Sequence, residues 1–238
     1  MSTKSTEVIG AVPGETLGAL ADILLKRKNG SLTDDQIKRF AVKQNPFAVE
    51  TVDSQIVFWA SLYAVAFEVD AKADLLKLNW PEPDINFWDV PMVRGLTESL
   101  AFKALKTWNK FPVGSYYPDL DVAVKESDRH PRNGTYGVRF HADSEGDDDQ
   151  KNISANKHRE IGTKGNTVLE AQVLEPMYFL KSGGRHLNEA TVNHAIGSRF
   201  ADGSVPDVLW GGKFYVSVGY HPDGAHPTLR ARVAVVTF

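Results

Sequence analysis

SRFADGSVPDVLWGGKFYVSVGYHPDGAHPTLRARVAVVTF, residues 198–238, is the stretch of the chain with the clearest structural pattern. Its segments 213–220 and 229–235 alternate apolar with other residues, and this period of two predicts strands. Side chains alternate across a strand, so each strand has an inward and an outward set. In the first strand the inward set is Phe214, Val216 and Val218. Loops rich in Gly, Pro, Asp and His surround both strands, which predicts a rigid frame carrying an irregular, polar and aromatic surface, as many binding sites have.

The bulk properties narrow the classes of partner. With 238 residues the chain is long enough for one larger domain or two smaller ones. The formal net charge of -3 gives no concentrated basic face, so we expect neither nucleic acid nor an anionic membrane as partner. The chain has no cysteine, which excludes disulfides, thiolate chemistry and cysteine-ligated zinc.

The sequence shows no pattern of a secretion signal or of a membrane-spanning segment. The first residues lack the basic and apolar regions of a signal peptide. The longest apolar run, residues 56–69, is shorter than the ~20 residues that span a bilayer. The sequence therefore predicts no membrane insertion and leaves the location open, with cytoplasmic or virion-associated as the default.

Residues 1–111 predict a mainly helical N-terminal portion. Leucines at helical spacing predict a first helix that stops at Asn29-Gly30, and Thr33 with Gln36 predicts a capping box that opens a second. The run 56–69 predicts a buried helix, although a strand remains possible, and residues 92–108 predict another helix. The apolar positions used for the first two helices are Leu17, Leu20, Leu24, Leu25, Ile37, Phe40 and Ala41.

Residues 112–238 predict a second domain with an α+β order. The segment 135–141 alternates as a strand with Tyr136, Val138 and Phe140 on one face. Ser154 is placed to cap a short helix through Glu160, and residues 165–167 begin a longer helix that ends before Gly183. Pro176 predicts a kink in that helix, or a helix that starts near it. Strand, two helices and then strands are typical of helices packed on an antiparallel sheet.

Two groups of polar residues raise the question of a bound ion. The acidic segment 143–149 lacks the Gly and Glu that an EF-hand loop needs at its sixth and twelfth positions, so we expect a solvated turn. Four histidines lie in the last quarter of the chain but in no H-E-x-x-H arrangement. We expect no metal and no cofactor. The four histidines are His186, His194, His221 and His226.

Motifs for enzyme chemistry are missing from the sequence. It has no Walker A loop, no G-x-G-x-x-G turn after a strand and no G-x-S-x-G nucleophile elbow. We therefore expect no catalytic residues. The alternative from another class is a metal-dependent hydrolase that uses the C-terminal histidines His186, His194 or His221, and a further alternative is a structural or virion assembly protein.

A spaced set of residues resembles a known family. The set resembles the variable, or target, proteins of diversity-generating retroelements, most of all their archaeal and candidate-phylum branch. The matching segments upstream are 134–140, 152–156, 167–170, 178–179 and 184–188, so the resemblance covers residues 112–238. In the C-terminal stretch the matching positions are Ser198, Arg199, Asp202, Gly203, Val205, Pro206, Val208, Trp210, Val216, Pro222 and the segment 229–235.

The resemblance implies a C-type lectin fold and a receptor-like binder of a protein ligand. In such proteins a reverse transcriptase rewrites selected codons, here within the region of about 198–238. The implied ligand-binding, variable residues are Tyr215, Ser217, Gly219, Tyr220, His221, Gly224, His226, Pro227 and Thr228, with Ala201, Ser204, Asp207 and Leu209 less firmly placed. The sequence departs from calcium-dependent sugar-binding lectins at Val205-Pro206-Asp207 and Trp210-Gly211-Gly212, so neither calcium nor sugar binding is implied.

Overall fold

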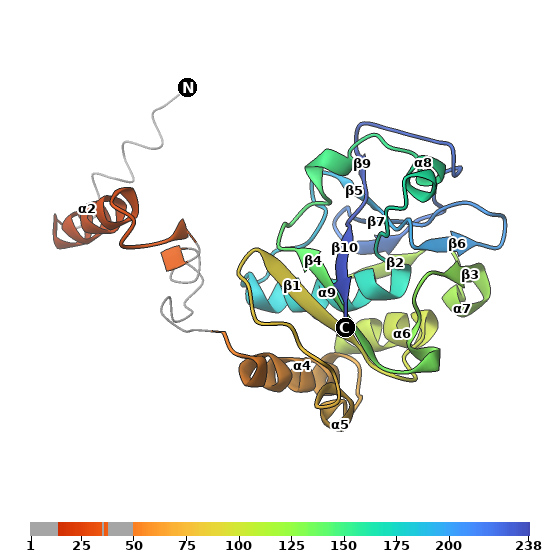
Figure 1. Cartoon of the computed structure of the whole chain (residues 1–238), viewed down its shortest axis with the longest axis horizontal. Helices are drawn as coiled ribbons and strands as arrows, with labels where there is room; N and C mark the ends of the chain where they lie inside the picture. Colours follow the sequence, from red (N-terminus) through yellow and green to blue (C-terminus); the bar gives the residue numbers. More distant parts are fainter. Residues whose placement is uncertain (1–13, 35, 38–49) are drawn as a thin grey trace. The chain divides into compact units, whose positions relative to one another are not determined.

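The computed structural model describes residues 14–34, 36–37 and 50–238 (Figure 1). The chain divides into two compact units, residues 1–49 and 50–238. In the first unit the helix α2 (Gly14–Lys28) confirms the predicted helix that stops at Asn29. Thr33 and Gln36 exchange the two hydrogen bonds of the predicted capping box, at 2.8 and 3.2 Å. The rest of that predicted helix, with Phe40 and Ala41, lies outside the described residues.

The predicted division at 111/112 falls inside the second unit. The reason is a strand, β1 (Phe87–Met92), in a region that the sequence assigned to loops and a helix. It pairs antiparallel with β4 (Tyr136–His141), where Val90 lies opposite Val138. Residues 50–111 therefore share a sheet and a core with the residues that follow them.

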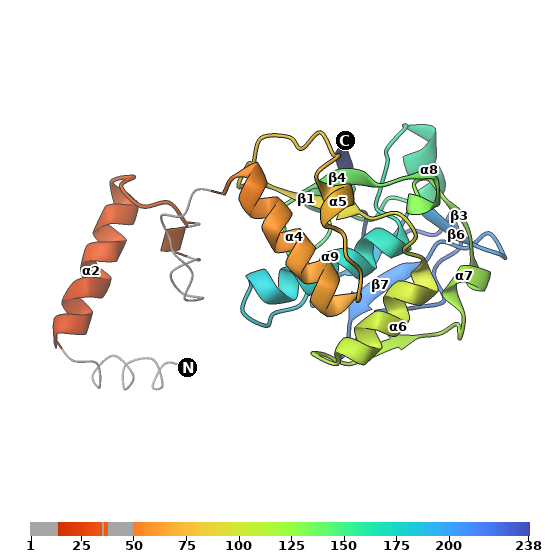
Figure 2. The same cartoon turned by 90° about the horizontal axis from the view of Figure 1, so that it is seen from below.

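The first sheet has three strands in the order β1-β4-β10, with β10 (Ala234–Thr237) on the other edge. Three helices, α4 (Val52–Ala66), α6 (Glu98–Trp108) and α9 (Val168–Lys181), pack against one another, and α9 also contacts β1 (Figure 2). The predicted buried segment 56–69 is thus a helix, since α4 buries Trp59, Leu62 and Tyr63. The short helix α5 (Lys72–Leu75) follows it.

Helix α9 begins and ends where the sequence predicts. Thr167 is its N-cap and forms a capping box with Glu170, which satisfies two backbone N–H groups that have no partner within the helix. Pro176 lies inside the helix, which starts a full two turns earlier at Val168. The predicted short helix is α8 (Ala155–Glu160), capped by Ser154.

The second sheet carries the middle part of the C-terminal stretch, residues 207–230. Its order is β2-β8-β7-β5-β9, with parallel pairing of β2 to β8 and of β5 to β9 and antiparallel pairing elsewhere. The strands are β2 (Val113–Ser115), β5 (Val192–His194), β7 (Asp207–Trp210), β8 (Phe214–Val216) and β9 (Leu229–Arg230). A third, two-stranded sheet pairs β3 (Val124–Ser127) with β6 (Ser198–Phe200), next to α7 (Leu120–Ala123). The two short 3-10 helices are η1 (Pro131–Asn133) and η2 (Asp148–Gln150). The predicted α+β class is confirmed.

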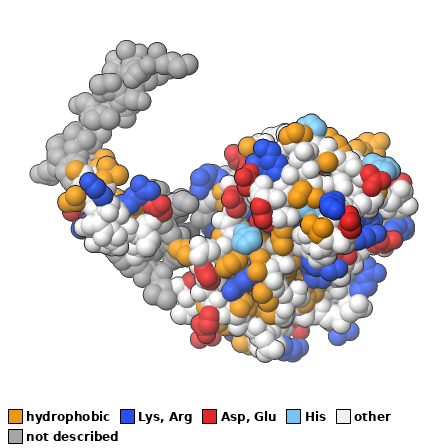
Figure 3. All heavy atoms as spheres, turned by 45° about the horizontal axis from the view of Figure 1, so that its top comes forward, with side chains coloured by type: hydrophobic (Ala, Val, Ile, Leu, Met, Phe, Trp, Pro, Cys, Tyr) orange, Lys and Arg blue, Asp and Glu red, His pale blue; other side chains and the backbone are white. Residues whose placement is uncertain are grey.

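Among the described residues, no helix is long and apolar enough to cross a membrane. The face drawn in Figure 3 carries acidic and basic side chains together, with histidines at the surface between them. That mixture agrees with the small net charge of the chain.

Candidate functional site

The hairpin of β7 and β8 forms the base of the candidate site. Val208 lies opposite Val216, and both are buried. Tyr215 lies opposite Leu209, and both are half-buried on the other face. Over residues 214–216 the predicted alternation is therefore confirmed, with Phe214 and Val216 in the core.

The alternation breaks after Ser217, and the inward placement of Val218 was wrong. Its side chain is 41% exposed. The Ser217 N–H donates to Asp207 O, and Tyr220 and Val205 exchange two backbone hydrogen bonds. Two residues, Val218 and Gly219, thus face the single Pro206, as in a β-bulge, and an extra residue reverses which side chains point inward.

Gly219 is required at this bulge. Its φ is +83°, in the region that favours glycine. A Cβ at this position would lie 2.0 Å from Val205 O, so the backbone approach also excludes a side chain. If position 219 is diversified, as the resemblance implies, substitutions there strain the backbone rather than only change a contact.

The segment 220–228 forms a loop held at several points. Asn156 of α8 donates its backbone N–H to Pro222 O at 2.9 Å and its side-chain amide to Asp223 Oδ1 at 2.6 Å. At the other end Thr228 O accepts from Val192 N at 2.9 Å. The loop is therefore fixed through its backbone and through Asp223. Its exposed predicted residues are Tyr220, His221, His226, Pro227 and Thr228, and Gly224 is half-buried.

A second turn, residues 201–204, adjoins that loop. Ala201 is exposed, and Ser204 is half-buried with its N–H and hydroxyl donating to Asp202. The Ser204 hydroxyl also lies 3.4 Å from Val218 O. We call residues 201–204 and 217–228 together the loop surface.

Asp207 does not belong to that surface. The sequence placed it among the less firm ligand-binding positions, but its side chain is buried and its Oδ1 lies 2.7 Å from His194 Nδ1. Burial raises the pKa of Asp207, while the hydrogen bond with His194 acts in the opposite direction. Asp207 therefore stabilises the interior beneath the strands instead of contacting a ligand.

The four C-terminal histidines have separate environments. His186 bonds to Glu175 at 2.7 Å and its ring stacks on Trp210 with centroids 3.3 Å apart. His221 lies 3.7 Å from Asp223 at the surface, and His226 bonds to Thr228 at 2.8 Å. In the described part of the chain no three His, Asp or Glu side chains are grouped so as to hold a metal ion.

The acidic segment 143–149 is more than a solvated turn. Glu145 accepts hydrogen bonds from the backbone N–H groups of Ala190 and Thr191. Asp147 is buried, and its Oδ2 accepts from Val233 N at 2.6 Å. The carbonyls of Asp143 and Glu145 accept from the fully buried guanidinium of Arg232 at 2.8 and 2.7 Å. The segment thus anchors the end of the C-terminal stretch, which corrects the sequence-based interpretation.

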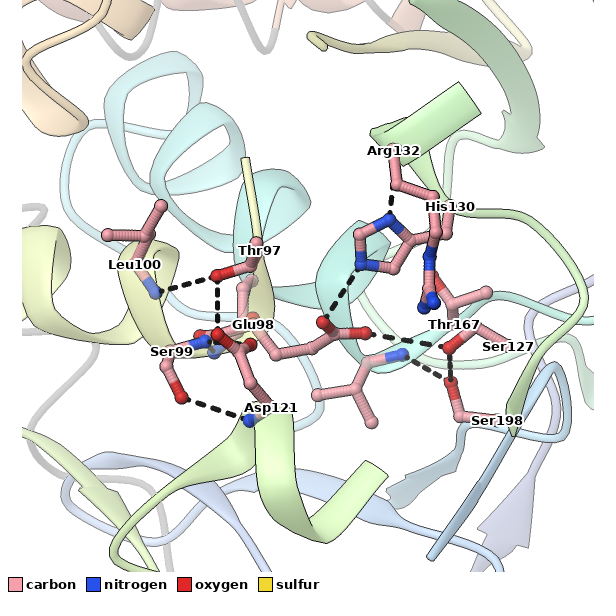
Figure 4. A network of polar contacts seen from close by, with 12 residues as sticks. Thr97, Glu98, Ser99, Leu100, Asp121, Ser127, His130, Arg132, Thr167 and Ser198 are labelled. Atoms are coloured by element: carbon pink, nitrogen blue, oxygen red, sulfur yellow. Dashed lines mark hydrogen bonds and ion pairs between the residues drawn. The ribbon is translucent and has the colours of Figure 1, made fainter. Parts of the chain in front are cut away.

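Serine, histidine and glutamate side chains form a network between α6, β3 and β6 (Figure 4). These residue types can form a catalytic site when the histidine is free to take a proton from the serine. His130 Nε2 lies 3.1 Å from Glu98 Oε2, and His130 Nδ1 accepts from Arg132 N at 3.0 Å. Both ring nitrogens are therefore occupied, and neither can take a proton from Ser127, which lies against Glu98 and Ser198. A nucleophilic serine needs a free base, so the arrangement is suited to joining α6 to the two-stranded sheet.

His158 is a buried histidine of α8. It is 1% exposed, and neither ring nitrogen has a hydrogen-bond partner among the described residues. Burial, and then the neighbouring His194, lower the pKa of His158 to about 4. The ring of Tyr220 makes an edge contact with His194, so His194 supports the start of the loop.

A pH dependence of stability follows from His158. Its pKa is lowered from 6.5 to about 4, so between these values the unfolded chain binds a proton that the folded chain does not. Stability from this group is present above pH 6.5 and is lost as the pH falls towards 4, by about 3 kcal/mol. Urea unfolding of the wild type and His158→Gln at pH 7.5 and pH 4.5 measures this. The variant should lose much less stability on acidification, and equal losses in the two proteins would contradict the expectation.

No protein family matches the chain, and no curated protein or solved structure matches it.

Sequence reasoning missed two surface residues. The exposure of Val218 was missed because the bulge at Gly219 is not visible in the sequence. Tyr116 was missed because it lies in a Pro-rich segment that was interpreted as a connection. Tyr116 is 61% exposed at the end of β2, beside β8. The repeated Tyr116-Tyr117 before Pro118 was the available signal, since a connection between domains has little need of two aromatic residues.

Proposed function

We propose that the chain is a ligand-binding protein with a C-type lectin fold, whose exposed C-terminal residues are diversified by a retroelement and bind a protein. The observation that carries this proposal is the division of residues 198–238 into two sets. The buried set includes Val205, Val208, Phe214, Val216 and Leu229. The exposed set lies on turns whose ends are fixed by backbone hydrogen bonds, and its members are Ala201, Tyr220, His221, His226, Pro227 and Thr228. Such a frame tolerates change at the exposed positions because their side chains do not hold the fold.

The order of the elements supports the lectin-like part of the proposal. β4 is followed by α8 and α9 and then by the short strands of the C-terminal stretch. This is the order that the family resemblance implies for a strand, two helices and a terminal sheet. The internal supports are polar rather than disulfide-bonded, which suits a chain without cysteine.

The composition of the exposed set supports a protein ligand. Tyr220 is 40% exposed next to His226, with ring centroids 6.4 Å apart. Tyrosine supplies a large, stiff contact area, and the exposed His221, His226 and Thr228 add polar groups around it, which suits a surface that binds a protein.

The proposal is tested by sequencing the gene and its flanks from many cells of the source population. Amino-acid differences are expected at codons for the exposed set and not at codons for the buried set. A near-identical repeat that differs at adenines should lie nearby, beside a reverse transcriptase gene. Differences spread evenly over both sets, or flanks without such a repeat, would show that the chain is not diversified in this way.

A further inference from the structure

Gly114 of β2 and Tyr116, the residue that follows this strand, lie beside Tyr215 and Ser217 but come from outside the C-terminal stretch. We propose that they form a constant part of the ligand-binding surface: Gly114 gives room to whichever side chain stands at position 215, and Tyr116 contacts the protein ligand in every variant. This inference rests on the proposed function and specifies which fixed residues serve it.

The strand pairing places these residues. β2 and β8 are parallel, and Gly114 lies in register with Tyr215. The Tyr116 N–H donates to Val216 O at 3.0 Å, so the pairing continues for one residue beyond β2. Neighbours in register point to the same face, and side chains two residues apart in a strand share a face. Gly114 therefore lies on the face that carries Tyr215, and Tyr116 follows at the end of the pairing, next to Ser217.

Gly114 is a glycine because of its neighbour. A Cβ at this position would lie 2.9 Å from Tyr215 Cδ2 and 3.1 Å from side-chain carbons of Lys213. The φ of Gly114 is not among the positive values in the chain, so the backbone itself would accept alanine. The tyrosine ring lies over the space that a side chain would fill, with Lys213 Nζ 4.5 Å from its centroid. If position 215 varies, a glycine opposite it lets both large and small side chains lie on β2.

Tyr116 is the exposed residue directly after β2. Its side chain is 61% exposed. The next residue, Tyr117, packs its ring on Phe200 at 4.6 Å and touches the Tyr116 ring at 5.2 Å. The inner tyrosine thus holds the outer one at the edge of the sheet, beside Ser217. An exposed tyrosine offers an apolar ring and a hydroxyl that can form a hydrogen bond when a ligand covers it, which is the chemistry of a protein contact residue.

The test uses the full chain displayed on cells. Positions 215, 217, 220, 221 and 226 are randomised, and variants that bind purified lysozyme are selected. Tyr116→Ala is then introduced into several binders of different sequence. We expect a loss of affinity of about tenfold or more in most of them. The matched control is Leu76→Ala after α5, because Leu76 is also 61% exposed, and it should leave the affinity unchanged.

The role of Gly114 has its own readout. Gly114→Ala should weaken lysozyme binding in binders with Tyr or Phe at 215 and spare those with Ser at 215, because the stiff ring at 215 meets the new methyl group, whereas the flexible end of Lys213 can move aside. Thermal unfolding of each variant checks that it remains folded. Introducing Tyr215→Ser alongside Gly114→Ala should remove any loss of stability that the methyl group causes.

The outcomes distinguish the roles of Tyr116 and Gly114 from the proposed function. If lysozyme binders arise and Tyr116→Ala leaves all their affinities unchanged, the role of Tyr116 is wrong while the proposed function stands. If Gly114→Ala acts equally whatever stands at 215, the role of Gly114 is wrong. If the randomised surface yields no binder to lysozyme, the proposed function fails and the inference fails with it.

Discussion

Replacing Glu170 with alanine is expected to lower the free energy of unfolding by about 3–5 kcal/mol. The Glu170 side chain is fully buried, and Arg129 Nε and Nη2 each donate to it at 2.8 Å. The Tyr136 hydroxyl and the Thr167 N–H complete its partners, at 2.9 and 2.8 Å. The variant would leave a largely buried guanidinium without its anion, together with two donors that no longer have an acceptor.

Burial raises the pKa of Tyr136, and the neighbouring Glu170 carboxylate raises it further, so the phenol stays protonated and donates its hydrogen bond. Urea unfolding at pH 7 measures the loss of stability. Glu160→Ala is the matched control, because Glu160 pairs with Lys157 at the surface, where an ion pair contributes about 0–1 kcal/mol. A loss below about 1 kcal/mol for Glu170→Ala would show that Arg129 finds another partner.

The pairing of Glu170 with Arg129 also explains why the capping box of α9 was predictable and its wider role was not. Thr167 and Glu170 stand three residues apart, and that spacing is visible in the sequence. The ion pair joins residues 41 positions apart. Local patterns therefore gave the start of the helix, while the second partner of the same carboxylate depends on the fold.

The strand β1 was missed for a related reason. Pro91 lies within it, and proline has no N–H for a sheet. β1 is at the edge of the three-stranded sheet, a position where proline is tolerated. Asp89 has the charge of a typical surface residue but is buried. Arg139 of β4 balances this charge there by donating to both its oxygens, at 2.6 and 2.7 Å. Neither the edge position nor the distant arginine is visible in the local pattern.

In the candidate site, the sequence separated the buried and exposed sets only while the strand was regular. Phe214 and Val216 lie as predicted, whereas the bulge at Gly219 turns Val218 outward. Asp207 reads as a turn residue next to Pro206, and its burial depends on His194. Exposure of the loop residues was predictable from composition, but the place of Gly114 beside Tyr215 depends on the parallel pairing of segments about a hundred positions apart.

Replacing Phe214 with alanine is expected to lower the free energy of unfolding by about 3–5 kcal/mol. Phe214 is 2% exposed and belongs to the main core cluster, so the smaller side chain would leave a cavity. Tyr215→Ala, one residue further, should lower it by about 1 kcal/mol or less, since that ring lies on the outer face against Leu209 and Lys213.

Val218→Ala distinguishes this arrangement from the regular strand that the sequence predicts. An inward valine would lose about 1–2 kcal/mol on truncation, but a side chain 41% exposed at a bulge should lose less than about 0.5 kcal/mol. Urea unfolding of the three variants under one condition gives the comparison. The expected order of destabilisation is Phe214→Ala, then Tyr215→Ala, then Val218→Ala. Equal and large losses for Phe214→Ala and Tyr215→Ala would contradict the division into a buried frame and an exposed surface, because a position that holds the fold cannot be freely diversified.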